Sequence, residues 1–373
     1  PAAEAAEAFR YMMASRHIGK VLLSYEDMSG LKARPIARPL PGFKRDGSYL
    51  ITGGMGGFGL KTAEYLLLQG AGAVHLAGRT LPQDPERQHA IVQLNKLAAA
   101  HGGQVVTHRL DVTQPRAVKA LVRKLAQDER PLRGVFHAAG VVEDQLIESM
   151  DDSRSIARVM APKIVGAQAL DEATRGLKLD HFVLYSSFTA ELGNVGQSSY
   201  IAANSYLNAL AENRRRQGLP ALAVGWGAIG DVGMVTESEG AGRLFEAAGI
   251  KTMKAADALA LLPVLYGVER SEVSVVEIDW RHAFGALTWL KNSARFALLQ
   301  QESQSGGVSD SVQLLMSMPE GERLDYVLTR LKQQLGTVLQ VDPQSIADSA
   351  RLAELGIDSL AGVELQTAIN VEF

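Results

Sequence analysis

The stretch Tyr49-Leu-Ile-Thr-Gly-Gly-Met-Gly-Gly-Phe-Gly59 decides the fold. An apolar run typical of a buried strand ends at Thr52, a glycine-rich loop follows, and a helical pattern begins after it. Glycines in such a loop permit a tight turn and let backbone N–H groups approach a pyrophosphate at the positive end of the helix. Because a strand precedes the loop and a helix follows it, the sequence predicts a dinucleotide-binding loop rather than a glycine turn without a ligand.

Further apolar runs alternate with longer helical stretches downstream of this loop. They are Val74–Ala77, Val105–Leu110, Gly134–Ala138, Phe182–Tyr185, Leu222–Trp226 and Val273–Ile278. Apolar strands that alternate with helices are typical of a parallel sheet with crossover helices. The sequence therefore predicts the α/β class, with a Rossmann-like doubly wound parallel sheet.

Composition limits the classes of function. The 373 residues include 38 basic and 41 acidic side chains, a net charge of −3 and no cysteine. This balance argues against nucleic acid or a membrane surface as a partner, and the lack of cysteine removes disulfides and Cys-based metal sites. No apolar run reaches the roughly 18 residues of a membrane helix. We expect a cytoplasmic protein without a metal site, and the start at Pro1, without a signal pattern, indicates a piece of a longer chain.

The end of the second strand indicates which dinucleotide binds. An acidic side chain there would accept hydrogen bonds from the ribose 2′-hydroxyl of NAD, but the sequence has Arg79. A guanidinium suits a 2′-phosphate, which favours NADPH and reduction, although an arginine at a strand end is often simply solvated. Asp111, after the third strand, could contact the adenine or cap the next helix.

Four polar residues form a candidate catalytic set: Lys163, Ser187, Tyr200 and Asn204. Tyr200 and Asn204 share a face of an expected helix, Ser187 ends the fifth strand, and Lys163 lies on an earlier helix. A tyrosine hydroxyl has a pKa of about 10, and the ammonium of Lys163 would lower it. Tyr200 would give its proton to a carbonyl oxygen becoming an alkoxide, and Ser187 would donate a second hydrogen bond. Asn204 would orient Lys163 or a water molecule.

Each of these side chains has a plain structural interpretation when it is taken alone. Tyr200 could be a core or interface tyrosine, Ser187 a turn residue, and Lys163 a solvated helix lysine. Together they lie after a dinucleotide loop, on the side of the sheet where such folds bind ligands. The combination predicts a reductase site.

Several motifs carry a family resemblance. They are Thr52–Gly59, Phe136-His-Ala-Ala-Gly140, Lys163, Tyr185-Ser-Ser187, Gly196-Gln197, Tyr200-Ile-Ala-Ala-Asn204 and Gly225-Trp-Gly227. From about Tyr49 to Phe296 the chain resembles the ketoreductase domain of type I polyketide synthases, a branch of the short-chain dehydrogenase/reductases. In most short-chain reductases the lysine follows the tyrosine by four positions, whereas Asn204 holds that place here, which marks the polyketide and fatty-acid synthase branch.

The resemblance implies NADPH-dependent reduction of a β-keto thioester, carried on an acyl carrier protein, to a β-hydroxyl. The cofactor-binding residues implied are Thr52, Gly53, Gly54, Gly56, Gly57, Phe58, Gly59, Arg79, Asp111, Val112, Ala138, Ala139 and Gly140. His137, near the cofactor, is expected to pack rather than to catalyse. Gly230–Gly249 is the natural place for a lid over the substrate, with Met234 as a candidate contact.

The resemblance also implies the handedness of the product. Val141-Val-Glu-Asp144 resembles the Leu-Asp-Asp motif of B-type ketoreductases, and Leu192 stands where A-type domains carry Trp. The expected product is a D-configured β-hydroxyl, with Asp144, Leu192 and Gln197 on the substrate side. Glu143 replaces an Asp of that motif, and Val195 and Ser199 replace residues common in B-type sequences.

The C-terminal part resembles the start of an acyl carrier protein domain. Arg323–Leu339 has helical periodicity, and Leu355-Gly-Ile-Asp-Ser-Leu360 begins a second helix. Ser359 would accept 4′-phosphopantetheine through a phosphodiester at the positive end of that helix, whereas an isolated Asp-Ser pair would simply be a helix cap. Since the sequence stops at Phe373, we expect a small truncated all-α carrier segment.

At the other end, Glu4–Met13 has helical character and Ile18–Ser24 predicts a short strand. The run from Phe9 to Val21 resembles the last residues of an enoylreductase domain. The implied partners are neighbouring enoylreductase, dehydratase and structural ketoreductase parts of one synthase that is a homodimer as a whole. The expected boundaries are an enoylreductase-like tail at 1–24, a linker at 25–48, the ketoreductase at 49–300, a linker at 301–313 and the carrier segment at 314–373.

Two other functions remain open from the sequence. One is a catalytically silent reductase-like scaffold within the synthase, although such domains usually lose the glycine loop or the tyrosine. The other is a free-standing short-chain dehydrogenase acting on a diffusible alcohol or ketone. Arg214-Arg-Arg216 could contact an acidic carrier domain, but a solvated cationic helix end is the expected interpretation.

Overall fold

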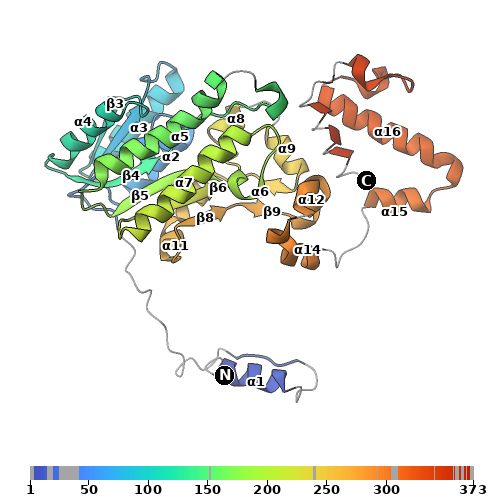
Figure 1. Cartoon of the computed structure of the whole chain (residues 1–373), viewed down its shortest axis with the longest axis horizontal. Helices are drawn as coiled ribbons and strands as arrows, with labels where there is room; N and C mark the ends of the chain where they lie inside the picture. The colour runs from blue at the N-terminus through green and yellow to red at the C-terminus, as the bar shows by residue number, and fades with distance from the viewer. Residues whose placement is uncertain are drawn as a thin grey trace. The chain divides into compact units, whose positions relative to one another are not determined.

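The computed structural model divides the chain into two compact units, Pro1–Leu40 and Pro41–Phe373. It describes residues 4–14, 20–24, 42–150, 153–237, 241–291, 293–303, 310–339, 341–355, 357, 361–362, 365–366 and 368–369. Figure 1 labels many of the helices and strands. In the first unit, α1 (Ala5–Met13) is the expected helix and buries none of its residues.

A seven-stranded parallel sheet forms the centre of the second unit, in the order β3-β2-β1-β4-β5-β6-β8. Its strands are β1 (Ser48–Thr52), β2 (Ala73–Gly78), β3 (Gln104–Arg109), β4 (Leu132–His137), β5 (His181–Ser187), β6 (Leu222–Trp226) and β8 (Glu272–Val275). The strand order reverses between β1 and β4, which is the switch point where doubly wound sheets bind ligands. The predicted Rossmann-like class is confirmed.

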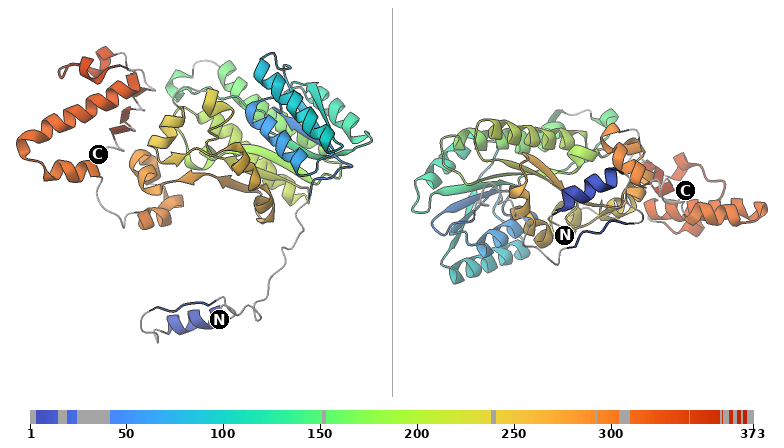
Figure 2. Two further views of the ribbon diagram at one scale, coloured as in Figure 1. Left: turned by 180° about the vertical axis from the view of Figure 1, so that it is seen from behind. Right: turned by 90° about the horizontal axis from the view of Figure 1, so that it is seen from below.

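Helices cover both faces of the sheet because successive residues of a buried strand point to opposite sides. Tyr49 and Ile51 belong to one hydrophobic cluster, and Leu50 between them belongs to the other. One face packs against α2 (Gly57–Leu68), α3 (Pro85–Ala100), α10 (Ala255–Ala260) and α11 (Leu262–Gly267). The other face packs against α4 (Pro115–Ala126), α5 (Ser153–Thr174) and α7 (Ser198–Arg216). Figure 2 shows the two helical layers with the sheet between them.

Short elements follow the strands, and several of them contribute to a third cluster around Phe188, Phe284 and Leu290. They are η2 (Ile147–Ser149), α6 (Thr189–Leu192), α8 (Met234–Glu237), α9 (Ala241–Ala247), β7 (Ile250–Lys251), β9 (Glu277–Ile278), α12 (Trp280–Ala286), α13 (Thr288–Lys291), η3 (Ala294–Phe296) and α14 (Ala297–Ser303). The lid region therefore contains α8 and α9.

The C-terminal part is helical, as expected for the start of a carrier domain. It contains α15 (Asp310–Ser317), α16 (Glu320–Leu339), η4 (Pro343–Ser345) and η5 (Leu352–Leu355). Leu335, Ile346 and Leu365 form its own small hydrophobic cluster. Helices α14 and α15 extend into both ends of the expected linker at 301–313.

Two strand predictions were wrong. Val273–Ile278 is not one strand: β8 ends at Val275 inside the parallel sheet, and β9 pairs antiparallel with β7 instead. The alternation changes phase at this point, since Val273 and Val275 pack in the first hydrophobic cluster whereas Val276 and Ile278 pack against the third. A continuous apolar run does not show such a change. In Ile18–Ser24 the described residues, 20–24, form no strand.

Among the described residues, no helix is long and apolar enough to cross a membrane. The described residues also contain no group of three or more His, Asp or Glu side chains placed to hold a metal ion.

Candidate active site

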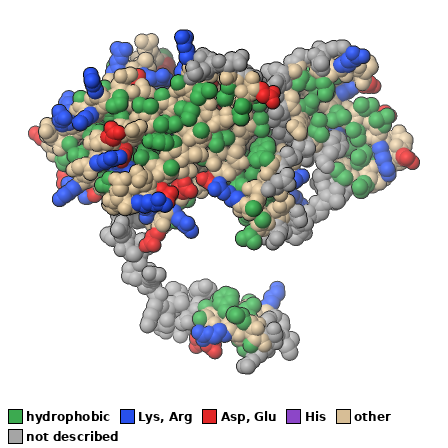
Figure 3. Space-filling model, viewed as in Figure 1, with side chains coloured by type: hydrophobic (Ala, Val, Ile, Leu, Met, Phe, Trp, Pro, Cys, Tyr) green, Lys and Arg blue, Asp and Glu red, His purple; other side chains and the backbone are tan. Residues whose placement is uncertain are grey.

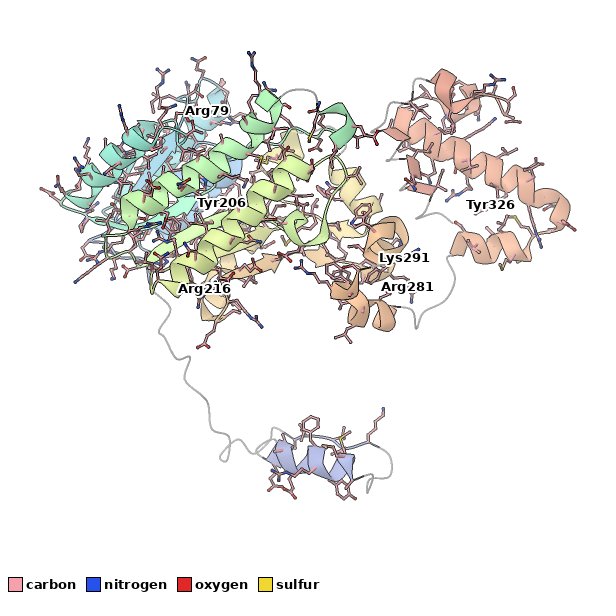
Figure 4. The ribbon with its side chains drawn as sticks, viewed as in Figure 1. Arg79, Tyr206, Arg216, Arg281, Lys291 and Tyr326 are labelled. Atoms are coloured by element: carbon pink, nitrogen blue, oxygen red, sulfur yellow. The ribbon has the colours of Figure 1, made fainter. Side chains whose placement is uncertain are left out.

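A cavity of about 1310 Å³ opens at the carboxyl ends of the parallel strands. Residues that follow β1, β2, β3, β4, β5 and β6 all line it, because parallel strands bring their carboxyl ends to one edge of the sheet. The cavity thus brings together the predicted glycine loop and three of the predicted catalytic residues, Lys163, Ser187 and Tyr200, whereas Asn204 does not line it. Figure 4 labels Arg79, which follows β2.

The glycine loop leaves a cradle that side chains would fill. Gly53 has φ +70°, and a Cβ there would lie 2.7 Å from the amide nitrogen of Ala139. A Cβ on Gly59 would lie 2.3 Å from the carbonyl oxygen of Gly53, and one on Gly57 would lie 2.7 Å from the amide nitrogen of Gly233. No side chain caps the N-terminus of α2, so its N–H groups face the cavity without a competing acceptor from the cap residue. This arrangement suits a bound diphosphate.

Most of the predicted cofactor residues line this cavity. They are Thr52, Gly53, Gly56, Gly57, Phe58, Gly59, Arg79, Asp111, Val112, Ala138, Ala139 and Gly140. Gly54 does not: a Cβ there would lie 2.6 Å from the carbonyl oxygen of Ile51, so this glycine permits close packing of the loop on the sheet.

At the β2 and β3 end of the cavity, Arg79 is exposed and follows β2. Asp111 does not cap α4, whose N-cap is Gln114; its Oδ1 instead accepts hydrogen bonds from the backbone N–H (3.0 Å) and the hydroxyl (2.7 Å) of Thr113. Sequence reasoning missed Arg87, which lines the same cavity from the first turn of α3. The sequence signal for it was an arginine in the first turn of the helix that follows β2, three residues after the N-cap Asp84.

The catalytic set converges from three elements. Tyr200 lies on α7, Ser187 ends β5, and Lys163 reaches the cavity from α5. The Nζ of Lys163 lies 5.4 Å from the centroid of the Tyr200 ring and donates a hydrogen bond of 2.7 Å to the carbonyl oxygen of Tyr185. The hydroxyl of Ser187 lies 2.9 Å from that of Thr189, which the sequence did not single out.

Asn204 is fully buried behind Tyr200, one helical turn further along α7. Its Nδ2 donates a hydrogen bond of 2.8 Å to the carbonyl oxygen of Tyr200. Its Oδ1 is buried without a hydrogen-bond partner among the described residues. An orphaned buried acceptor beside a cavity suits a water molecule or a donor that arrives with a ligand.

The electrostatics of the set differ from the expectation in one respect. Burial lowers the pKa of Lys163 to about 7. Burial also raises the pKa of Tyr200, with hydrogen bonding from Asn204 and Ser187 opposing it. The predicted fall of the Tyr200 pKa is therefore wrong for the protein alone, since the loss of hydration outweighs the two hydrogen bonds and Lys163 does not contribute to the shift. Tyr200 holds its proton at neutral pH, as a proton donor must.

Asp144 lines the cavity, and Gln197 donates to both of its oxygens at 3.1 and 3.3 Å. Burial raises the pKa of Asp144. Met234 also lines the cavity. Leu192 does not line it but is buried, and its carbonyl oxygen accepts a 2.9 Å hydrogen bond from the indole N–H of Trp289.

Other candidates have structural roles or lie elsewhere. His137 is fully buried with its Nδ1 2.7 Å from the hydroxyl of Thr52, and burial lowers its pKa to about 3. Arg214 is not part of a solvated helix end: it is 1% exposed and paired with Asp171 at 2.5 Å. Ser359 lies outside the described residues.

Comparison with known families gives two matches. Residues 47–231 match the model of the KR domain. Residues 329–373 match the model of the phosphopantetheine attachment site. The order of the two matches along the chain is the order that the sequence motifs predict.

The chain is similar to parts of very large proteins. It is 35% identical over 380 residues to phthioceranic/hydroxyphthioceranic acid synthase of Mycobacterium bovis, covering 100% of this chain and 17% of the relative. It is 35% identical over 375 residues to a mycocerosic acid synthase-like polyketide synthase of Mycobacterium tuberculosis, again covering 100% of this chain and 17% of the relative. The chain thus spans about a sixth of the length of these relatives.

A solved structure described as an A1-type ketoreductase superposes with a TM-score of 0.66 at 33% identity, covering 74% of this chain and 56% of the other.

Proposed function

Because this chain belongs to the ketoreductases of polyketide synthases and continues into the start of a carrier domain, we propose that it reduces a β-keto thioester to a β-hydroxy thioester with NADPH. The convergence of Tyr200, Ser187 and Lys163 on the cavity of the glycine loop is the observation that carries this proposal. The chain is thus an oxidoreductase part of a larger synthase.

The residues present fit a dinucleotide. The cradle over Gly53 and Gly59 has no room for a Cβ, and the uncapped N-terminus of α2 supplies N–H donors for phosphate. Arg79 and Arg87 line the end of the cavity where a 2′-phosphate would lie, which supports NADPH over NADH. When bound, the nicotinamide supplies the hydride.

The protein supplies the proton and holds the carbonyl oxygen. Tyr200 keeps its proton at neutral pH and donates it to the oxygen as that oxygen becomes an alkoxide. Ser187, held by Thr189, donates a second hydrogen bond to the same oxygen. Lys163, in its charged form, stabilises the tyrosinate that remains after proton transfer. Asn204 fixes the turn of α7 that carries Tyr200.

We also propose a D-configured product. Gln197 fixes Asp144 beside the cavity, and the neighbouring Glu143, which does not line the cavity, pairs with Arg158. Leu192 stands at the position where A-type ketoreductases carry a tryptophan. Chiral analysis of the alcohol made from a β-ketoacyl thioester checks the assignment; an L-configured product would overturn it and leave the reductase function intact.

The substrate is proposed to arrive as a thioester on 4′-phosphopantetheine attached to Ser359 of the complete carrier domain. The enoylreductase, dehydratase and structural ketoreductase partners, the homodimeric synthase and the cytoplasmic location stay predictions from the sequence. Mass spectrometry of the longer chain after treatment with a phosphopantetheinyl transferase tests the attachment site, since Ser359→Ala should remove the added mass.

The test of the proposed function is the variant Tyr200→Phe. It removes only the hydroxyl, so reduction of acetoacetyl thioester should fall by about a thousandfold or more while NADPH binding, followed by fluorescence, stays unchanged. Tyr206→Phe is the matched control, because Tyr206 lies on the same helix and does not line the cavity (Figure 4). Full activity of Tyr200→Phe would refute the mechanism, and failure of the unaltered chain to bind NADPH would favour a silent scaffold.

A further inference from the structure

A second hollow of about 450 Å³ adjoins the reaction cavity. The two share Gly193, Asn194, Val195 and Trp289 as lining residues. The far side of the second hollow is formed by residues 145–148 and by Ser198 and Ile201 of α7. Because Gln145 follows Asp144 and Ile201 follows Tyr200, this hollow continues directly from the place where the carbonyl is reduced.

Trp289 forms the boundary between the two spaces. It reaches them from α13, far along the chain from the catalytic residues. Figure 4 labels Lys291, the last residue of this short helix. The indole N–H donates to the carbonyl oxygen of Leu192, and a Cβ on Gly193, which has φ +80°, would lie 3.4 Å from the indole nitrogen. The hydrogen bond and this close approach fix the orientation of the ring.

The surface of the second hollow is mostly apolar. Leu146, Ile147, Val195, Ile201 and Trp289 supply its hydrophobic side chains. The hydroxyl of Ser198 is directed to the sulfur of Met150, at 3.7 Å. The amides of a pantetheine arm would lose hydrogen bonds to water in such a space, whereas an alkyl chain would gain from leaving water.

We propose that the second hollow binds the distal alkyl chain of the acyl thioester, and that Trp289 is the residue that determines how well long chains are accepted. This inference rests on the proposed reductase function and names a substrate class for it, namely thioesters whose acyl chain extends several methylene groups beyond the reacting carbonyl. Contacts with the distal chain form on binding and persist in the transition state, so they act on KM rather than kcat.

The experiment compares acetoacetyl and β-ketodecanoyl thioesters of N-acetylcysteamine as substrates of the full chain. The unaltered protein should show a kcat/KM about tenfold or more higher for the long substrate, because each well-buried methylene group contributes up to about fourfold. Ile147→Asp should remove most of this preference through KM. Ile147 is 74% exposed and lines only the second hollow, so the variant should fold and should reduce acetoacetyl thioester normally.

Trp289→Ala should likewise lower the preference for the long chain, and Trp289→Phe, which keeps an apolar ring but loses the bond to Leu192, should lower it less. Val264→Asp is the matched control for Ile147→Asp. It adds the same negative charge at an exposed aliphatic residue of α11 that lines neither the reaction cavity nor the second hollow.

Equal kcat/KM for both substrates in the unaltered protein would overturn the inference and leave the reductase function standing. An equal effect of Ile147→Asp on both substrates, or an effect confined to kcat, would overturn it as well. No reduction of either thioester would refute the proposed function itself.

Discussion

Helices α5 and α7 each contribute a buried cation, and the two cations differ in their surroundings. Arg214 of α7 is 1% exposed, pairs with Asp171 of α5 at 2.5 Å and lies 3.7 Å from the centroid of the Phe182 ring. Lys163 of α5 is 3% exposed, and its bonded neighbour is the carbonyl oxygen of Tyr185. Burial lowers the Lys163 pKa to about 7, with no carboxylate among its causes.

The difference separates a structural charge from a functional one. A buried charge with a hydrogen-bonded counter-ion holds two elements in register. A buried charge without a counter-ion destabilises the fold, and such charges occur mainly at functional sites. Arg214 therefore locks α7 against α5, and the same helix pair holds Lys163 close to Tyr200. Figure 3 shows lysine and arginine side chains at the surface of this unit on the face in view.

The largest expected effect comes from Lys163→Met, which keeps the length of the side chain and removes its charge. Reduction of acetoacetyl thioester should fall by about a thousandfold, because the tyrosinate left after proton transfer loses its cation. The free energy of unfolding at neutral pH should not fall, since an uncompensated buried charge is removed. Activity assays and urea unfolding of the same preparations measure both quantities.

The pH dependence of stability gives this variant a sharper test. The Lys163 pKa is about 7 in the folded protein and about 10.4 in an unfolded chain, so the unfolded state binds more protons between these values. The unfolding free energy of the unaltered chain should therefore increase as the pH rises above 7. This increase should be absent in Lys163→Met. An identical pH slope in both proteins would show that Lys163 is not buried as a charge.

Arg214→Met should have the next largest effect, on stability instead of activity. It leaves the buried Asp171 with the half-exposed Arg175 as its remaining charged partner, and breaking a buried pair costs about 3 kcal/mol or more. Per folded molecule, kcat should change little. Urea unfolding measures the loss, and the double variant Asp171→Leu/Arg214→Met should recover most of it. If Arg214→Met lowered kcat as much as Lys163→Met, Arg214 would not be a purely structural cation.

The sequence could not separate these two cations. Arg214 opens a run of three arginines typical of a solvated helix end, and its partner Asp171 lies 43 residues earlier, with no spacing rule to connect them. Lys163 was assigned only in combination with Tyr200, Ser187 and the glycine loop, because a lysine on a helix has no local signal of its own. The glycine loop and the strands were predictable, because their signals are local: apolar runs, a turn and a helix start.

Features that depend on tertiary packing were missed for the same physical reason. Trp289 reaches the cavity from α13, and Thr189 matters only because β5 directs Ser187 toward it. The change from β8 to β9 depends on which strand lies alongside, and a single segment does not contain that information. Local patterns therefore predicted the end of the cavity formed by the glycine loop better than the end lined by Thr189 and Trp289.

An exposed cation extends the comparison. Arg79 is exposed at the end of β2, so Arg79→Ala should leave stability unchanged within about 0.5 kcal/mol. The KM for NADPH should rise by about tenfold to a hundredfold through loss of a charge-assisted contact with the 2′-phosphate, while the KM for NADH stays the same. Arg109→Ala is the matched control, because Arg109 ends the adjacent strand β3 and does not line the cavity. An equal rise for NADH would overturn the assignment of Arg79.

The smallest expected effect, and the most direct comparison of the two cation types, is the pH profile of reduction. As the pH rises through about 7, Lys163 loses its charge, so kcat/KM, which reports the free enzyme, should fall by up to about tenfold per pH unit. Tyr200 cannot cause this fall, since its pKa is raised above the usual 10 and it stays protonated. In Lys163→Arg the guanidinium keeps its charge, as that of Arg214 does, so whatever activity remains should be level across this range. A break near pH 7 that persists in Lys163→Arg would assign the titration to another group and would separate Lys163 from the proton-transfer step.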